Sequence, residues 1–289
     1  MKQTILVVGV TDIPGESVAR QLHKDGYVVR ILTRDPEESR IKLGDAFQFV
    51  KGDVDDILSL EKALYGCFGV YINLRGGPKA EDFDKIEHKG TANIAKVSAM
   101  MNVQRLIYLS DAIVSEENFG FPFVKAKLQA EEAIRKSGVP YSIFCATHFM
   151  EFLPLYIRWN RGYVIGNQSY PIHWLAVNDY AKMVSRAFQL PEAANKRFFI
   201  YGPEAWTMSE AIKKYCLIVH PKVQISYIPI WLTSLIGKIT FNTELQVITE
   251  LMKLFEKVCE GGYPEEANEL LGASTTTIEQ WCKKQQKVV

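Results

Sequence analysis

A glycine-containing segment near the start of the chain has the residue types and spacing of a phosphate-binding loop. An apolar run at residues 5–8 leads into Gly9, and Gly15 opens a segment of helical length. Glycines at these positions let backbone N–H groups and a helix N-terminus face a pyrophosphate, because no Cβ obstructs the turn or the ligand. The pattern predicts a dinucleotide site. Its expected contacts are Gly9, Thr11, Asp12, Ile13 and Gly15.

Asp12 departs from the usual composition of such a loop. Gly9 and Gly15 hold the outer positions of a G-x-x-G-x-x-G spacing, and Asp12 occupies the middle one. A carboxylate there adds bulk and negative charge close to a pyrophosphate, although aspartate tolerates left-handed backbone better than most residues. We expect weakened dinucleotide binding, with complete loss of the site as the alternative.

Arg34 is the residue expected to choose between the two nicotinamide dinucleotides. It follows the apolar run at residues 28–33, where the second strand of such a fold meets the adenosine ribose. A guanidinium binds a 2′-phosphate through two hydrogen bonds, so Arg34 favours NADP(H) over NAD(H), with support from Arg40 or Lys42. Two alternatives stay open: Asp35 binds a ribose hydroxyl, or Arg34 is simply solvated.

The elements that must position these residues alternate along the first half of the chain. Short β-branched runs and amphipathic segments follow one another, which is typical of a parallel sheet covered by helices on both faces. The expected strands cover residues 5–8, 28–33, 47–50, 70–74, 106–109 and 141–144. The expected helices cover residues 15–23, 59–64, 85–101 and 124–136. The predicted fold class is α/β, with a doubly wound parallel sheet of the Rossmann type.

The alternation loosens after residue 149. Residues 171–177 and 179–190 look like one more strand and helix of the main sheet. Later segments have helical patterns, at residues 208–219, 244–258, 264–270 and 277–284. We therefore predict an NAD(P)-binding domain over residues 1–155, with 171–203 returning to it, and a smaller, mainly helical substrate-side domain over residues 204–289.

Composition excludes several classes of function. A net charge of +1 lacks the basic excess of nucleic-acid-binding proteins. The five cysteines are odd in number and form no C-x-x-C pair, which argues against disulfides and zinc and favours a reducing, cytoplasmic location. Gln224, Pro229 and Lys238 interrupt the most apolar later stretch, so no membrane span is expected. The histidines have no metal-ligand spacing.

Further segments, by their order and spacing, resemble a known family. They are residues 52–56, 106–110, 137–141, 149–151 and 201–204, together with Lys127, Glu131, Thr207 and Glu210. With the glycine loop and Arg34, they make the chain resemble the NmrA-like branch of the atypical short-chain dehydrogenase/reductase superfamily. It is also similar to isoflavone reductase-like proteins. The resemblance spans most of the chain.

This resemblance implies an NADP(H) cleft formed by the glycine loop, Arg34 and residues after the third and fourth strands. Asp53 and Val54 are implied near the adenine, and Asn73 and Leu74 beside the cofactor. Asp53 has an alternative role as the cap of the helix that follows. Asn73 is a lone amide at the end of an apolar strand, and such a group needs a hydrogen-bonding partner.

Catalytic chemistry is where the chain departs most from the dehydrogenases of this superfamily. These enzymes transfer a proton with a tyrosine four residues before a lysine, and Phe123 stands at the tyrosine position. Lys127 matches the lysine of isoflavone reductase-like enzymes; its alternative is a solvated side chain. His148 is a second candidate for proton exchange, with a structural role as its alternative. Phe149 and Met150 are expected to contact substrate.

Two functions of different classes fit these residues. The first is an NADPH-dependent reductase of a quinone, enal or similar small molecule by direct hydride transfer, with Lys127 orienting the ribose. The second is a non-catalytic NADP(H)-binding sensor, regulator or assembly factor that acts through a protein partner. Phe123 and the absence of the family's arginine–proline pair at positions 145 and 146 favour the second.

Overall fold

A parallel sheet of seven strands forms the centre of the computed structural model, which describes residues 2–77 and 79–286. The strand order is β10-β6-β5-β4-β1-β2-β3, and all neighbours run parallel. The strands are β1 Thr4–Val8, β2 Val28–Thr33, β3 Gln48–Lys51, β4 Gly69–Ile72, β5 Arg105–Asp111, β6 Tyr141–Ala146 and β10 Lys196–Ile200. The predicted doubly wound α/β fold is confirmed.

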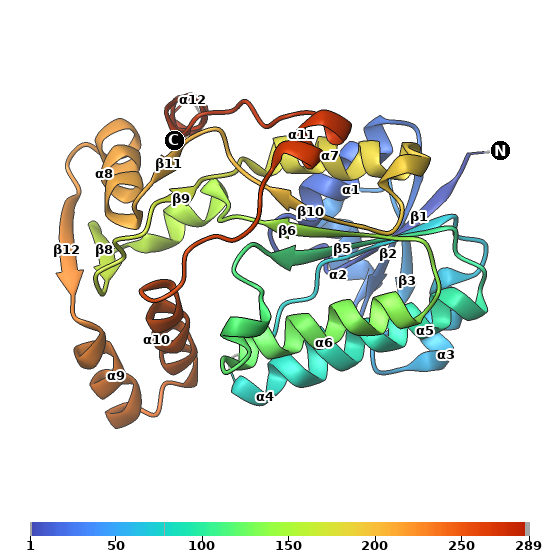
Figure 1. Ribbon diagram of the computed structural model, residues 1–289, viewed down its shortest axis with the longest axis horizontal. Coiled ribbons are helices and arrows are strands. Elements are labelled where there is room, and N and C mark those ends of the chain that lie inside the picture. The colour runs from blue at the N-terminus through green and yellow to red at the C-terminus, as the bar shows by residue number, and fades with distance from the viewer. Residues whose placement is uncertain (1, 78, 287–289) are drawn as a thin grey trace.

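Helices cover both faces of this sheet (Figure 1). One face carries α1 Gly15–Lys24, α7 Val177–Gln189 and α11 Glu265–Leu271, and the other carries α3 Ile57–Leu64, α5 Thr91–Met100 and α6 Pro122–Lys136. Ile5 and Val7 of β1 pack in the first core, whereas Leu6 packs in the second. Whole strands are apolar because neither face of the sheet meets water.

The helix expected at residues 85–101 is present, but its first part is π-helical and not α-helical. The chain forms the short helix α4 Ala80–Asp82, the π-helical segment η1 Phe83–Gly90 and then α5. Helical segments of this wide type are rare and often accompany functional sites. The segment η1 brings Glu87 into the interior, where its side chain is 1% exposed.

A second lobe lies beyond the carboxyl ends of β5 and β6 (Figure 1). It contains the segment η3 Met150–Tyr156 and a sheet of β7 Ile157–Arg158, β8 Arg161–Ile165 and β12 Gln224–Ile228. A second pair is β9 Ile172–His173 with β11 Ala205–Trp206. The helices are α8 Met208–Val219, α9 Ile230–Ile239, α10 Thr243–Phe255 and α12 Ile278–Gln285. Helices make up most of this lobe, and small sheets accompany them. A separate substrate-side domain over residues 204–289 stays a prediction.

The expected strand at residues 171–177 is wrong. The main sheet is completed by β10, while only two residues of the expected strand pair with another strand, as β9 with β11. Trp174 and Leu175 are fully buried, so their apolar character reflects packing between the two parts of the molecule. No helix within residues 2–77 and 79–286 has the length and apolar character needed to cross a bilayer.

A buried carboxylate joins three elements of the main domain. Glu131 on α6 is 0% exposed. It accepts hydrogen bonds from Ser110 Oγ on β5 at 2.6 Å and from Arg197 Nε on β10 at 3.0 Å. Arg135, one helical turn further along α6, approaches the same carboxylate at 2.7 Å. Two guanidinium groups thus compensate the desolvated charge, as a buried carboxylate requires.

Glu131→Ala is expected to lower the free energy of unfolding by about 3 kcal/mol, because it leaves a partly buried guanidinium without its partner. Glu132→Ala is the matched control, since Glu132 is exposed and its ion pairs lie at the surface, where such pairs contribute about 0–1 kcal/mol. Urea denaturation followed by circular dichroism measures both. Equal losses in the two variants would contradict the role assigned to Glu131.

Candidate functional site

The glycine loop joins β1 to α1 with very little space around its backbone. Gly9 has φ +85°, and a Cβ built there would lie 1.7 Å from the carbonyl oxygen of Asn73. At Gly15 a Cβ would lie 2.2 Å from the carbonyl oxygen of Gly9. Neither position accepts a side chain. The loop therefore brings backbone, rather than side chains, to the amino end of α1, as phosphate binding requires.

Asn73 holds this loop in place. Its side chain is 4% exposed, and its Nδ2 donates to the carbonyl oxygens of Gly9 at 3.1 Å and Asp12 at 3.3 Å. The hydrogen-bonding partner that the sequence requires for this lone amide is thus the loop backbone. Thr11 in the loop is exposed, whereas Ile13 packs against the first core.

The charge of Asp12 lies among cations. Burial raises the pKa of the Asp12 carboxyl, and the positive charges of Arg75 and Lys42 partly oppose that shift. Arg75 is exposed and follows β4 by three residues. It is not among the residues that the sequence predicted for the site. Its position two residues after Asn73, on the same strand end, is the signal that would have found it. A cation at this place reduces the repulsion between Asp12 and an anionic ligand.

Arg34 follows the end of β2, and its side chain has no partner among the described residues, whereas Asp35 and Arg40 nearby both have one. Asp35 caps α2 Pro36–Leu43, accepting from the N–H groups of Glu37 at 3.1 Å and Glu38 at 3.0 Å. Arg40 pairs with Asp45 at 3.5 Å. Arg34 is exposed and makes no hydrogen bond or ion pair within the described parts of the chain. The capping role of Asp35 disfavours the alternative in which it binds a ribose.

Asp53 does not cap the helix that follows β3. Asp56 is the cap of α3 and accepts from the N–H groups of Leu58 and Ser59, so the alternative role considered for Asp53 is wrong. The Asp53 carboxylate instead accepts from the N–H of Asp55 at 3.4 Å. Val54 lies beside Leu74, and both contact the position where a Cβ on Gly90 would stand. Neither Asp53 nor Val54 lines the two cavities described below, and their binding of adenine stays a prediction.

Lys127 forms a buried ion pair instead of pointing into solvent. Its side chain is 6% exposed, and its Nζ lies 3.1 Å from Glu87 Oε2 and donates to the carbonyl oxygen of Leu109 at 3.0 Å. Burial favours the neutral amine, but the adjacent Glu87 charge holds the pKa of Lys127 above its ordinary value. Glu87 Oε1 also accepts from the N–H of Gly76 at 2.7 Å. The solvated alternative for Lys127 is therefore wrong.

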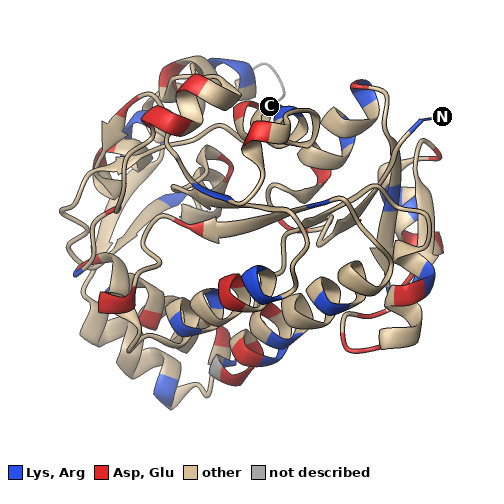
Figure 2. Cartoon of the chain, turned by 45° about the vertical axis from the view of Figure 1, so that its right-hand side comes forward, with Lys and Arg blue, Asp and Glu red and all other residues tan. Residues whose placement is uncertain are grey.

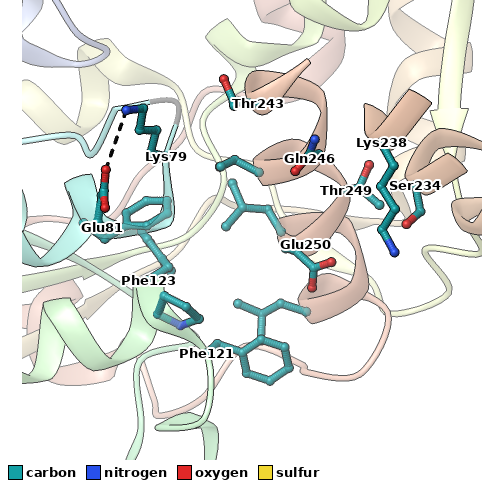
Figure 3. A pocket seen from close by; sticks show the side chains of 15 residues that line it. Lys79, Glu81, Phe121, Phe123, Ser234, Lys238, Thr243, Gln246, Thr249 and Glu250 are labelled. Carbon is teal, nitrogen blue, oxygen red and sulfur yellow. Dashed lines mark ion pairs between the residues drawn. The ribbon is translucent and has the colours of Figure 1, made fainter. Parts of the chain in front are cut away.

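A large apolar cavity lies beside Phe123, one turn before Lys127 on α6. Its volume is about 510 Å³. The ring of Phe123 packs edge-on against Phe83, with 5.9 Å between centroids. Figure 3 shows Phe121 and Phe123 on one side and side chains of α9 and α10 on the other. The polar residues of the lining are Lys79, Glu81, Ser234, Lys238, Thr243, Gln246, Thr249 and Glu250.

A second, much smaller cavity lies at the carboxyl ends of β5 and β6. Asp111, Thr147, His148 and Gln168 line it, and Phe255 closes it from α10. Burial raises the pKa of Asp111 to about 6, and its Oδ1 accepts from the N–H of Ile113 at 3.0 Å. The buried Oε1 of Gln168 has no hydrogen-bond partner within the described residues.

His148 is enclosed by aromatic rings. Its Nε2 lies 3.1 Å from Tyr156 Oη, and burial lowers the pKa of His148 to about 4. The ring is therefore neutral at physiological pH. Phe149 and Met150 are 4% and 0% exposed, and neither lines the two cavities described above. Their expected contact with substrate stays a prediction.

The described residues form no donor set of the kind that holds a metal ion in proteins. Across residues 2–77 and 79–286, no three His, Cys, Asp or Glu side chains gather as metal ligands would. All five cysteines are free. The glycine loop brings backbone N–H groups to the amino end of α1, which suits a phosphate-bearing organic ligand.

Comparison with known proteins gives relatives of two kinds. Photosystem II assembly factor Ycf39 of Trieres chinensis is 23% identical over 241 residues, 82% of this chain and 75% of that protein. The (4-alkanoyl-5-oxo-2,5-dihydrofuran-3-yl)methyl phosphate reductase of Streptomyces griseus is 27% identical over 209 residues, 71% of this chain and 70% of that protein.

Solved structures agree on the fold. Triphenylmethane reductase of Citrobacter sp. has a TM-score of 0.79 at 18% identity, covering 99% of this chain and 100% of that one. The same enzyme was solved with NADP(H) bound. Quinone oxidoreductase QOR2 of Escherichia coli, complexed with NADPH, has a TM-score of 0.74 at 16% identity, covering 97% and 99%.

The family match extends over nearly the whole sequence. The sequence model of the NmrA-like family covers residues 1–284, from before β1 to within α12. The resemblance carried by the glycine loop, Arg34 and Lys127 is thereby confirmed, and the chain belongs to the NmrA-like family.

Proposed function

We propose that this protein is an NADPH-dependent reductase that transfers a hydride to a quinone, an enal or a similar apolar acceptor. The observation that carries the proposal is the 510 Å³ cavity beside Phe123. It has the volume of a small-molecule site, and apolar groups make up most of its surface, although eight of its fifteen lining residues are polar or charged. The triphenylmethane and quinone reductases of the same fold support this choice of acceptor.

The cofactor assigned by this proposal is NADP(H). The free guanidinium of Arg34 would bind the 2′-phosphate, the glycine loop the pyrophosphate, and Arg75 would offset the negative charge of Asp12. Asn73 and Leu74 would lie beside the cofactor. The neighbours solved with NADP(H) bound support the assignment. A cytoplasmic location belongs to the same proposal, since the cysteines are free.

The chemistry that NADPH supplies when bound is hydride donation to the acceptor. Reduction of a quinone or enal also consumes one proton, and Phe123 has none to give. His148 is neutral and engaged with Tyr156. Asp111 lines the second, smaller cavity and not the large one. It is the better donor for an acceptor that extends to the carboxyl end of β5, because its carboxyl retains a proton to higher pH than an ordinary aspartate. Its O–H bond would break toward the acceptor, and water would return the proton.

Lys127 would act on the cofactor side of this site. Its amine is bonded to the carbonyl oxygen of Leu109, two residues before Asp111 on the same strand. To reach a ribose hydroxyl, the ammonium would share its hydrogen bonds with Glu87. The ion pair therefore favours orientation of the ribose by a fixed positive charge over proton transfer by the lysine.

A second function, a non-catalytic NADP(H)-binding regulator, is favoured by the same ion pair. If Glu87 keeps the ammonium of Lys127 engaged, dinucleotide binding proceeds without the contact that orients the nicotinamide half. The Ycf39 assembly factors among the relatives support this alternative. It predicts binding of NADP(H) without turnover.

Turnover separates the two functions. Purified protein with NADPH is expected to reduce at least one member of a panel of quinones, enals and triphenylmethane dyes, measured as loss of NADPH absorbance. Heat-inactivated protein is the control for uncatalysed oxidation. Tight NADPH binding with no oxidation across the panel would reject the reductase and support the regulator.

Arg34→Ala is expected to weaken NADPH binding by about 1 to 3 kcal/mol, the scale of a charged hydrogen bond, and to leave NADH binding nearly unchanged. Fluorescence titration with each dinucleotide measures the two affinities. Arg158→Ala is the control, because Arg158 is an exposed arginine on β7, in the second lobe. Equal losses for NADPH and NADH would remove the basis for choosing NADP(H).

Asp111→Asn is expected to reduce kcat about 10²-fold or more, the contribution of a positioned proton donor. With a carboxyl pKa of about 6, the proton needed for catalysis is lost as pH rises, so wild-type kcat falls above pH 6. In Asp111→Asn this fall of kcat above pH 6 is expected to disappear. Asp45→Asn, at an exposed carboxylate, is the control and is expected to keep the wild-type pH profile. A variant with wild-type kcat and the same pH profile would exclude Asp111 as the donor.

A further inference from the structure

The helix α9 presents its apolar side to solvent. Trp231 is 66% exposed, Leu235 46% and Ile239 67%, and their spacing of four residues places them along one face. Ile236 is 42% exposed beside them, and Phe241 is 87% exposed just after the helix. We call these five side chains the α9 face. They are among the largest apolar groups that the molecule leaves uncovered.

The opposite side of α9 is small and polar. Thr233 is 4% exposed, and its hydroxyl donates to the carbonyl oxygen of Ile230 at 2.9 Å. Gly237 packs against α10, where Gln246 Nε2 donates to its carbonyl oxygen at 2.9 Å. An ordinary surface helix buries its apolar stripe and exposes its polar one. The reversed arrangement indicates that the α9 face is covered by another molecule.

The α9 face carries no charge. Lys238 is the only charged residue of the helix; it is exposed and stands at the edge of this face, three residues after Leu235, where it also lines the large cavity. Figure 2 shows acidic and basic residues intermingled along the chain. Peripheral membrane helices usually pair an apolar face with a cluster of Lys and Arg, which α9 lacks. An uncharged face suits an identical uncharged face.

The area of the α9 face matches a modest dimer contact. Large side chains present about 150–250 Å² each when fully exposed, so these five offer roughly 500–750 Å² at their observed exposures. A specific interface buries about 600–1,000 Å² on each partner. We propose that the α9 face is the contact between two copies of this chain, related by a twofold axis that pairs α9 with α9.

Such a contact would also affect the large cavity. Ser234 and Lys238 follow Trp231 and Leu235 by three residues each on α9 and line that cavity next to the α9 face. Pairing of the two α9 helices therefore braces one wall of the cavity in each copy. The dimer contact lies in the second lobe, away from the glycine loop that begins α1, so dinucleotide binding does not depend on it.

Sedimentation velocity of the full chain over a range of concentrations tests this inference. The wild-type protein is expected to sediment as a dimer at micromolar concentration. Leu235→Glu places a carboxylate at the centre of the contact. It is expected to raise the dissociation constant of the dimer at least 100-fold, so that the variant sediments as a monomer. Leu217→Glu on α8, at a site 73% exposed and outside the α9 face, is the control and keeps the dimer.

Circular dichroism and thermal unfolding of Leu235→Glu establish that the variant is folded. A wild-type protein that is monomeric at 100 µM overturns the proposal, and so does a dimer that survives Leu235→Glu unchanged. Flotation with neutral and with anionic phospholipid vesicles is the third measurement. Binding of monomer to vesicles that is lost in Leu235→Glu would assign the α9 face to a membrane surface and likewise overturn the dimer.

Discussion

The buried ion pair between Lys127 and Glu87 holds together the segments at the carboxyl ends of β4 and β5. Lys127 comes from α6, and Glu87 from the π-helical segment η1. Through their remaining hydrogen bonds the two side chains also hold Gly76, after β4, and Leu109, near the end of β5. Four segments distant in sequence are thereby joined where parallel strands end. Removing either charge would leave its partner desolvated and unpaired, so the pair acts as a single unit.

This pair also explains why enzyme and regulator are close alternatives for the same chain. In a dehydrogenase of this superfamily, the lysine needs a tyrosine whose phenol it activates. Here the ring at that position is Phe123, which packs against Phe83 and forms a wall of the large cavity. The position of the dehydrogenases' proton donor is thus apolar in this chain. A carboxyl with a raised pKa is found instead at Asp111, which lines the smaller cavity together with Phe255 at the end of α10.

The sequence was a good guide to what the backbone does and a poorer one to polar side chains. Gly9, Gly15 and the apolar strands follow from local sterics and from burial on both sheet faces, so the fold was predictable. Glu87 and Asp111 were not identified, because each depends on contacts with residues far away in sequence. Glu87 lies in an ordinary polar run, and only the wide helical segment η1 turns it inward.

Misassignments in the second half of the chain have a related cause. Trp174 and Leu175 look like strand residues because they are apolar, yet they are buried between the two parts of the molecule rather than paired in the main sheet. Asp35, by contrast, had a local signal that favours its capping role, since the proline after it suits the first turn of a helix.

The position of α11 has a consequence for how the chain reaches its native state. Ala267 and Leu271 belong to the same core as Ile5 and Val18, although more than two hundred residues separate them. During synthesis the first half of the chain emerges long before these residues do, so its core stays incomplete until α11 has been synthesised. The core of the Rossmann-type part therefore contains residues that are synthesised at widely different times. A fragment that ends before α11 lacks part of this core.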